Sequence, residues 1–224
     1  MASEFPGSPK LIRGALVAYE TPVLGVVPSI IVFQYNPEQL SRSLTSRGAP
    51  WEYRDTGEAR EDAYLTLGPP RESIDLSVEI DAADQLERSD PLAMASGIQP
   101  ALSALELLMY PKSTQVLLNR TAAAAGRWTL KVEDTPTVLF VWGLSRVLPV
   151  RLSSFRVTEQ AFDPALNPIQ AKVDLGLEVM SYLDLKDDDL GTGAYMAAMV
   201  QREVLAGLNL VNSAQNLLSG LIPI

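Results

Sequence analysis

Within residues 72–80, polar and apolar side chains alternate at every position from Ser73 to Ile80. A period of two is typical of a β-strand that buries one face, because successive side chains of a strand point to opposite sides. Residues 171–179 repeat the pattern. The chain therefore has to bury several half-apolar strands. The apolar positions are Ile74, Leu76, Val78 and Ile80 in the first segment and Val173, Leu175, Leu177 and Val179 in the second.

Weaker patterns of the same kind predict five further strands. The longest of them changes phase, because Val150 and Leu152 share one parity whereas Phe155 and Val157 have the other. We therefore expect a β-bulge or bend at Ser153-Ser154, where the phase changes. The five predicted strands are Leu11–Tyr19, Val27–Tyr35, Trp128–Glu133, Thr137–Trp142 and Val147–Gln160.

Two segments have helical spacing. The first, Pro91–Met109, follows a candidate N-cap at Asp90 and contains Pro100, which predicts a kink, or a loop before a shorter helix that starts near Gln99. The second, Ala194–Leu218, carries an apolar stripe. This stripe either docks on a neighbouring subunit or covers the chain's own β domain. Its interface candidates are Met199, Val204, Leu208 and Val211.

Two polar stretches connect these elements. Between Ser41 and Pro70 the chain is rich in charge and turn formers, which predicts either a solvated loop or a hairpin arm. Asp184–Gly193 lacks the ligand spacing of a calcium loop and reads as a flexible acidic hinge. An arm would supply contacts typical of interfaces, and its candidates are Trp51, Tyr53, Arg54 and Tyr64.

These elements define the expected domain organisation. Residues 1–10 form a flexible leader, residues 11–183 a β domain, residues 184–193 an acidic linker, and residues 194–224 a C-terminal helix. The fold class is mainly β (α+β). About seven strands with one buried face favour a β-barrel or a two-sheet sandwich, here with one embedded helix and a C-terminal helical extension.

Composition excludes several functions. The 224 residues include no cysteine and no histidine, so disulfides and the commonest metal ligand and general base are absent. We expect no catalytic, cofactor or metal site. The net charge of −9 argues against nucleic-acid binding. No apolar run approaches the ~18 residues of a membrane span, so we expect no membrane insertion.

Four motifs follow one another in an order that resembles the tube-protein domain of contractile injection systems, the phage-tail-like family that often precedes a LysM module. The resemblance covers about residues 10–183. The motifs are an early strand with Phe33, Asn36 and Pro37; PPRESIDLSVEID; a strand with Pro136, Leu139, Phe140, Trp142 and Gly143; and a hairpin with Thr158, Glu159, Phe162, Asp163, Asn167 and Pro168.

The resemblance implies a tail-tube-like fold and a structural, non-enzymatic role. It implies a ring of six copies in the baseplate that adapts the inner tube to the spike hub. The partners would be the chain itself, the tube protein, the hub protein and other baseplate subunits. Such a particle assembles in the bacterial cytoplasm and can be released from the cell. Where relatives continue into LysM, this chain has the helix at 194–218.

Ring assembly requires strand edges that a neighbouring copy can pair with. We expect one of the long strands, Val147–Gln160 or Ile169–Tyr182, to supply the edge, which makes Phe155 and Val157 interface candidates. The polar residues of the two alternating strands, Asp75 and Glu79 or Asp174 and Glu178, would line a channel or face solvent.

Two other functions compete with the ring. A monomeric ligand- or sugar-binding β-barrel or sandwich would need an aromatic pocket built from Trp51, Trp128 and Trp142. An enzyme would need a carboxylate pair, for which Glu159 and Asp163 are candidates, although Asp163 next to a proline is more typical of a turn residue.

Overall fold

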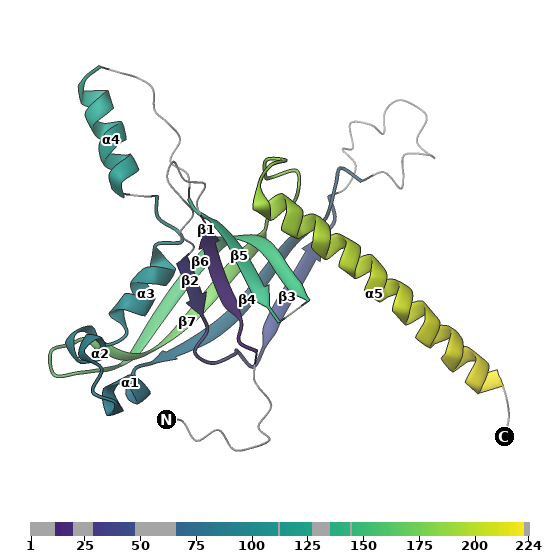
Figure 1. Ribbon diagram of the computed structural model, residues 1–224, viewed down its shortest axis with the longest axis horizontal. Helices are drawn as coiled ribbons and strands as arrows, with labels where there is room; N and C mark the ends of the chain where they lie inside the picture. The colour runs from purple at the N-terminus through teal and green to yellow at the C-terminus, as the bar shows by residue number, and fades with distance from the viewer. Residues whose placement is uncertain are drawn as a thin grey trace.

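The computed structural model describes residues 12–19, 29–47, 66–111, 113–126, 135–143 and 145–221, with the backbone alone at 115, 211, 212 and 214–221. It contains one open, seven-stranded antiparallel sheet in the order β2-β1-β5-β6-β7-β4-β3 (Figure 1). The mainly β class is confirmed, but neither a closed barrel nor a two-sheet sandwich is. The strands are β1 (Ala15–Tyr19), β2 (Ser29–Val32), β3 (Leu40–Thr45), β4 (Arg71–Asp81), β5 (Thr137–Trp142), β6 (Arg146–Phe162) and β7 (Pro168–Val179).

The predicted strands correspond to this sheet except at two places. β3 lies in the stretch predicted to be a loop or an arm, and it pairs with β4 from Leu40↔Leu76 to Thr45↔Arg71. The strand predicted at Trp128–Glu133 lies outside the described residues. The alternation in β4 and β7 is confirmed: the apolar side of these strands is buried, while Asp75, Glu79 and Lys172 are exposed on the other.

The predicted bulge in β6 is confirmed. The register against β7 shifts between Leu152 and Ser154, so that Leu152 lies opposite Leu177 and Phe155 lies opposite Leu175. The extra residue returns Phe155 and Val157 to the face that carries Leu152. All three side chains therefore face the core.

The described part of the chain also contains five helices. They are α1 (Ala83–Glu87), α2 (Pro91–Ser96), α3 (Gln99–Glu106), α4 (Ser113–Ala124) and α5 (Leu190–Leu221). The helix predicted at Pro91–Met109 is broken at Gly97, whose φ is +57°, and α3 begins at Gln99 as expected. Asp90 caps α2 by accepting hydrogen bonds from the N–H groups of Leu92 and Ala93. The sequence did not predict α4.

The core lies between the curved sheet and the helices. Phe140, Leu16 and Leu148 from one half of the sheet are fully buried, as are Ile74 and Leu177 from the other half. Helices α2 and α3 close one end with a group of apolar residues. The residues that α3 and the turn before it bury are Ile98, Leu102 and Leu105.

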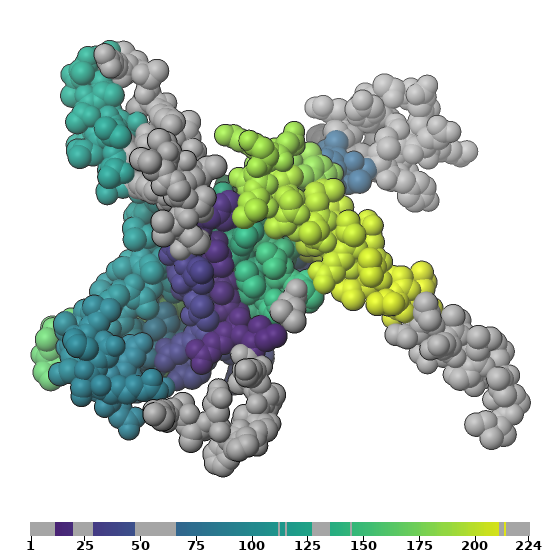
Figure 2. Space-filling view, viewed as in Figure 1, coloured from purple at the N-terminus to yellow at the C-terminus, as the bar shows by residue number. Residues whose placement is uncertain are grey.

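Helix α5 starts beside the sheet and extends away from the body, as its backbone in Figure 1 and its coloured part in Figure 2 show. It begins at Leu190, inside the segment predicted to be a hinge and four residues before the predicted Ala194. Tyr195 and Ala198 near its start are buried in the core, and Met199 packs against the core cluster. In the part of the chain that the structure describes, no helix is long and apolar enough to cross a membrane.

Candidate functional site

The sheet has unpaired backbone edges at three places among the described residues. β2 and β3 are the outermost strands. The third edge belongs to β6, because β5 pairs only with Arg146–Val150 whereas β7 pairs with β6 as far as Phe162. Residues 151–162 of β6 therefore present one free edge. Such edges readily pair with another chain.

This arrangement corrects one expectation about the long strands. β7 is bonded to β6 on one side and to β4 on the other along nearly its whole length. Its backbone groups are already used, so β7 cannot supply the edge for a neighbouring copy. The distal half of β6 keeps that possibility.

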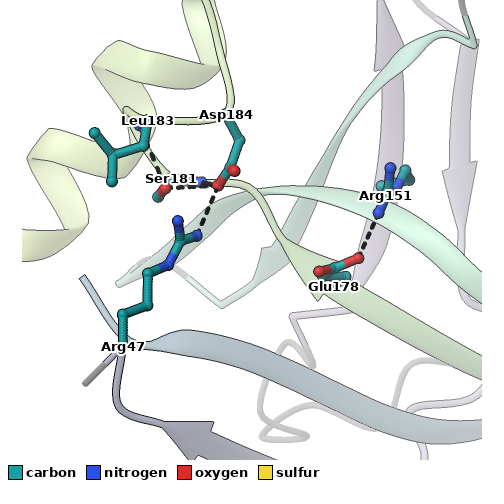
Figure 3. A network of polar contacts seen from close by, with 6 residues as sticks. All are labelled: Arg47, Arg151, Glu178, Ser181, Leu183 and Asp184. Atoms are coloured by element: carbon teal, nitrogen blue, oxygen red, sulfur yellow. Dashed lines mark hydrogen bonds and ion pairs between the residues drawn. The ribbon is translucent and has the colours of Figure 1, made fainter. Parts of the chain in front are cut away.

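The four strands β6, β7, β4 and β3 form one side of the sheet, which we call the β6-β7-β4-β3 layer. The face of this layer that points away from the core is polar. Asp75, Glu79, Asp174 and Glu178 all lie on it, as the alternation predicted. Arg151 on β6 donates a hydrogen bond to Glu178 on β7 over 2.6 Å (Figure 3). Both side chains are largely exposed, so this ion pair contributes little to the stability of the fold.

Phe155 and Val157 are half-buried and pack against the core cluster of their own chain. An interface at this part of β6 would therefore be made by the free backbone edge and by the outward-facing neighbours Ser154, Arg156 and Thr158, which are exposed. The bulge is the physical reason, since it turns the apolar side chains inward.

Helix α5 contacts the body through residues near its start, and every described side chain from Glu203 to Leu210 is exposed. Tyr195, Ala198 and Met199 contact the body, whereas Val200, Val204 and Leu208, spaced by four residues, are exposed at 56%, 58% and 57%. The alternative that the stripe covers the chain's own sheet is therefore wrong for Val204 and Leu208. Met199 is a core contact and not a free interface residue. The side chain of Val211 lies outside the described residues.

A buried carboxylate fixes α5 to the sheet. Glu72 on β4 is 3% exposed and lies between two guanidinium groups. Arg42 Nε of β3 is 3.2 Å from Glu72 Oε1, and Arg202 Nη2 of α5 donates to Glu72 Oε2 over 2.7 Å. One acidic side chain thus joins the edge strand β3, its neighbour β4 and α5. We call these three residues the Glu72 triad.

A second contact holds the start of α5. The hydroxyl of Tyr19 on β1 donates to Asp189 Oδ1 over 2.7 Å, and the same oxygen accepts from the N–H of Gly191 in the first turn of α5. Burial and the neighbouring Asp189 carboxylate raise the pKa of Tyr19 above its ordinary value. Asp189 therefore helps to order the segment that connects β7 to α5.

Asp184 orders the start of the same connection (Figure 3). Its Oδ2 accepts hydrogen bonds from the N–H and the hydroxyl of Ser181, over 2.9 and 2.6 Å, and lies 3.2 Å from Arg47 Nη2. Burial opposes ionisation, but the two hydrogen bonds and the charge of Arg47 outweigh it and hold the pKa of Asp184 below its ordinary value.

The remaining predicted site residues are placed as follows. Asp163 accepts hydrogen bonds from the N–H groups of Ala165 and Asn167 and from the Asn167 amide, which confirms its role in the turn and lowers its pKa. Trp142 stacks on Phe140, with ring centroids 5.8 Å apart. The arm candidates Trp51, Tyr53, Arg54 and Tyr64, and also Trp128, lie outside the described residues.

Within the described ranges, no group of three or more acidic side chains is arranged to hold a metal ion. The sequence missed the Glu72 triad, because its members come from three distant segments. Glu72 has the same parity as the apolar residues Ile74 and Leu76 of its strand. Its burial could have been inferred from this position. No protein-family model matches the chain, and no curated protein matches its sequence.

Proposed function

We propose that this chain is a structural subunit of a ring in the baseplate of a contractile injection system, where it adapts the inner tube to the spike hub. The observation that carries the proposal is the β6-β7-β4-β3 layer. Both of its outer edges, at the distal half of β6 and at β3, are unpaired among the described residues.

The direction of the strands favours copies of the same chain as neighbours. All adjacent pairs in the layer are antiparallel, so with four strands β3 runs opposite to β6. β3 of one copy can therefore continue the antiparallel order with β6 of the next, without either copy being turned over. Pairing of two different edges is a heterologous interface, which generates a ring when the rotation closes.

In this proposal a barrel forms only when several subunits assemble. Each subunit contributes an open sheet, and the ring completes a tail-tube-like barrel whose polar face, with Asp75, Glu79, Asp174 and Glu178, lines the channel. The resemblance of the motifs implies six copies, with tube and hub proteins above and below. The exposed stripe of α5 at Val204 and Leu208 is then available to other baseplate subunits. Assembly takes place in the bacterial cytoplasm.

Disulfide trapping tests the interface directly, because the natural chain has no cysteine. Ser43→Cys on β3 is combined in turn with Ser154→Cys, Arg156→Cys or Thr158→Cys on the polar face of β6. Within one copy these positions are three strands apart, ~14 Å, too far for a disulfide. We expect at least one pair to give a ladder of cross-linked oligomers that ends at the size of the closed ring.

The control pairs Ser43→Cys with Asp174→Cys on the central strand β7, which should stay monomeric. Electron microscopy of the particle assembled with the tube and hub proteins tests the adaptor role. The subunit should form one symmetric layer between them, and particles without it should lack the junction. Monomers with all three pairs, or a position elsewhere in the particle, would refute the proposal.

A further inference from the structure

The edge strand β2 directs a defined set of backbone groups away from the sheet. The N–H of Phe33, which follows β2, donates to the carbonyl of Gly14 over 2.9 Å, on the β1 side. Because a strand alternates the direction of its backbone groups, Ile31 shares that direction. Ile30 and Val32 therefore point their N–H and C=O groups outward, where no described strand pairs with them.

A groove of about 560 Å³ lies beside this edge. It is lined by β2, the end of β4 and the helices α1 to α3, and its buried apolar lining residues include Phe33, Ile98 and Leu105. The volume falls within the ~300–1,000 Å³ range of sites that bind ligands. A groove with both apolar and polar lining residues beside a free strand edge can accept an extended segment of chain.

The charges around the groove restrict the ligand further. Four carboxylates and two guanidinium groups line it, those of Glu79, Asp81, Asp84, Asp90, Arg13 and Arg88. Asp81 and Asp90 accept hydrogen bonds from backbone N–H groups at the starts of α1 and α2. The excess of negative charge favours a segment that carries a basic residue.

We propose that this groove binds an extended peptide segment of another protein, which adds a strand to β2. The segment has apolar side chains at alternate positions and at least one Lys or Arg. Its backbone pairs with Ile30 and Val32. Alternate side chains enter the groove over Leu105, and the others join the exposed side chains of Ile30 and Val32, which are 60% and 53% accessible. This site uses β2 and not β3 or β6, so it does not depend on the ring.

The unpaired backbone groups of β2 determine which kind of ligand can bind there. Backbone hydrogen bonds give affinity in strand addition, while pockets for alternate side chains give specificity. A helical ligand would satisfy its own backbone and leave Ile30 and Val32 unpaired. The chemistry of the edge thus selects an extended ligand.

The probe is a phage-displayed library of random seven-residue peptides, selected against the immobilised full-length chain. We expect the enriched peptides to alternate apolar residues and to carry a basic residue. A labelled peptide from the enriched set should bind at least tenfold more weakly to Val32→Pro, which loses an outward N–H and no bond to β1. Val32→Thr, which keeps the outward N–H and nearly the same side-chain shape, is the matched control and should bind normally.

A second measurement guards against misfolding of the proline variant. The enriched peptide is N-methylated at one position at a time and tested on the natural chain. Binding should fall at alternate positions only, because only those N–H groups face β2. No enrichment, enriched peptides with helical spacing, or equal loss at all positions would overturn the inference. Failure of the disulfide cross-linking between β3 and β6 would refute the ring but would not affect this inference.

Discussion

At the scale of single residues, Glu72 shows how a buried charge depends on its partners. We expect Glu72→Ala to lower the free energy of unfolding by about 2–4 kcal/mol, because it leaves two guanidinium groups facing each other without a counter-ion. Arg42 and Arg202 are about one-third exposed, so water screens part of their repulsion. Urea unfolding at pH 7 measures the change. Arg202→Ala keeps Glu72 paired with Arg42 and should cost less. Equal costs would show that the triad does not act as a unit.

Asp184 predicts a dependence on pH. Its pKa is lowered in the folded protein, so its contribution to stability is complete above the ordinary value of 3.8 and is lost as the pH falls through the lower folded value. We expect Asp184→Ala to destabilise the chain by about 1 kcal/mol at pH 7, mainly through the lost hydrogen bonds to Ser181. The difference from the natural chain should shrink toward pH 3 in urea titrations. A constant difference would contradict this assignment.

The sequence predicts single residues where their partners are local. Asp90 and Asp163 bond to N–H groups two to four residues away, so cap and turn chemistry were sufficient to place them. Glu72 could not be placed in this way, because Arg202 lies 130 residues further along the chain. Its burial depends on the topology, which periodicity alone does not give.

At the scale of elements, two glycines make opposite predictions. Gly97 ends α2 with φ of +57°, and an added Cβ would meet the carbonyl oxygen of Pro168 in the β6–β7 hairpin. We expect Gly97→Ala to destabilise the fold by more than about 1 kcal/mol. Gly207 in α5 has no atom within 4 Å of such a Cβ, so Gly207→Ala should raise the helicity of α5. Thermal unfolding followed by circular dichroism distinguishes the two. Equal effects would contradict the strain at Gly97.

Elements with a strong apolar period were predictable, and polar ones were not. Thr137–Trp142 matches β5 to the residue, and the phase change located the bulge in β6. β3 was missed because Leu40–Thr45 is largely polar and exposed, since it is held by pairing with β4 and not by burial. α4 was missed because Ser113–Ala124 carries no apolar stripe.

At the scale of the whole molecule, the strand order decides which strands lie at the edges of the sheet and which lie inside it. The alternation predicts which side chains are buried, but it cannot say which strands lie at the margins. The order β2-β1-β5-β6-β7-β4-β3 places β7 inside the sheet, and among the described residues it leaves one edge of β2, of β3 and of the distal half of β6 unpaired. Which strands lie at the edges depends on the topology, and this is why the sequence could name β6 as the proposed pairing edge only together with β7.

The buried start and the exposed distal part of α5 allow folding and assembly to be separated. Val204 and Leu208 are exposed, so Val204→Asp with Leu208→Asp should leave the free energy of unfolding within about 0.5 kcal/mol of the natural value. Tyr195 is buried in the core, so Tyr195→Ala should lower the free energy of unfolding by about 3 kcal/mol.

Assembly should show the reverse order of effects. If the exposed stripe of α5 docks on another baseplate subunit, the double aspartate variant places two charges in an apolar contact and should be excluded from particles, although its monomer is folded. Quantitative mass spectrometry of purified particles measures its incorporation against the natural chain expressed with it. Ser213→Asp, at an exposed polar position of the same helix, controls for added charge. Equal incorporation of both variants would mean that the stripe makes no contact in the particle, and would leave the pairing of β3 with β6 as the interface to test.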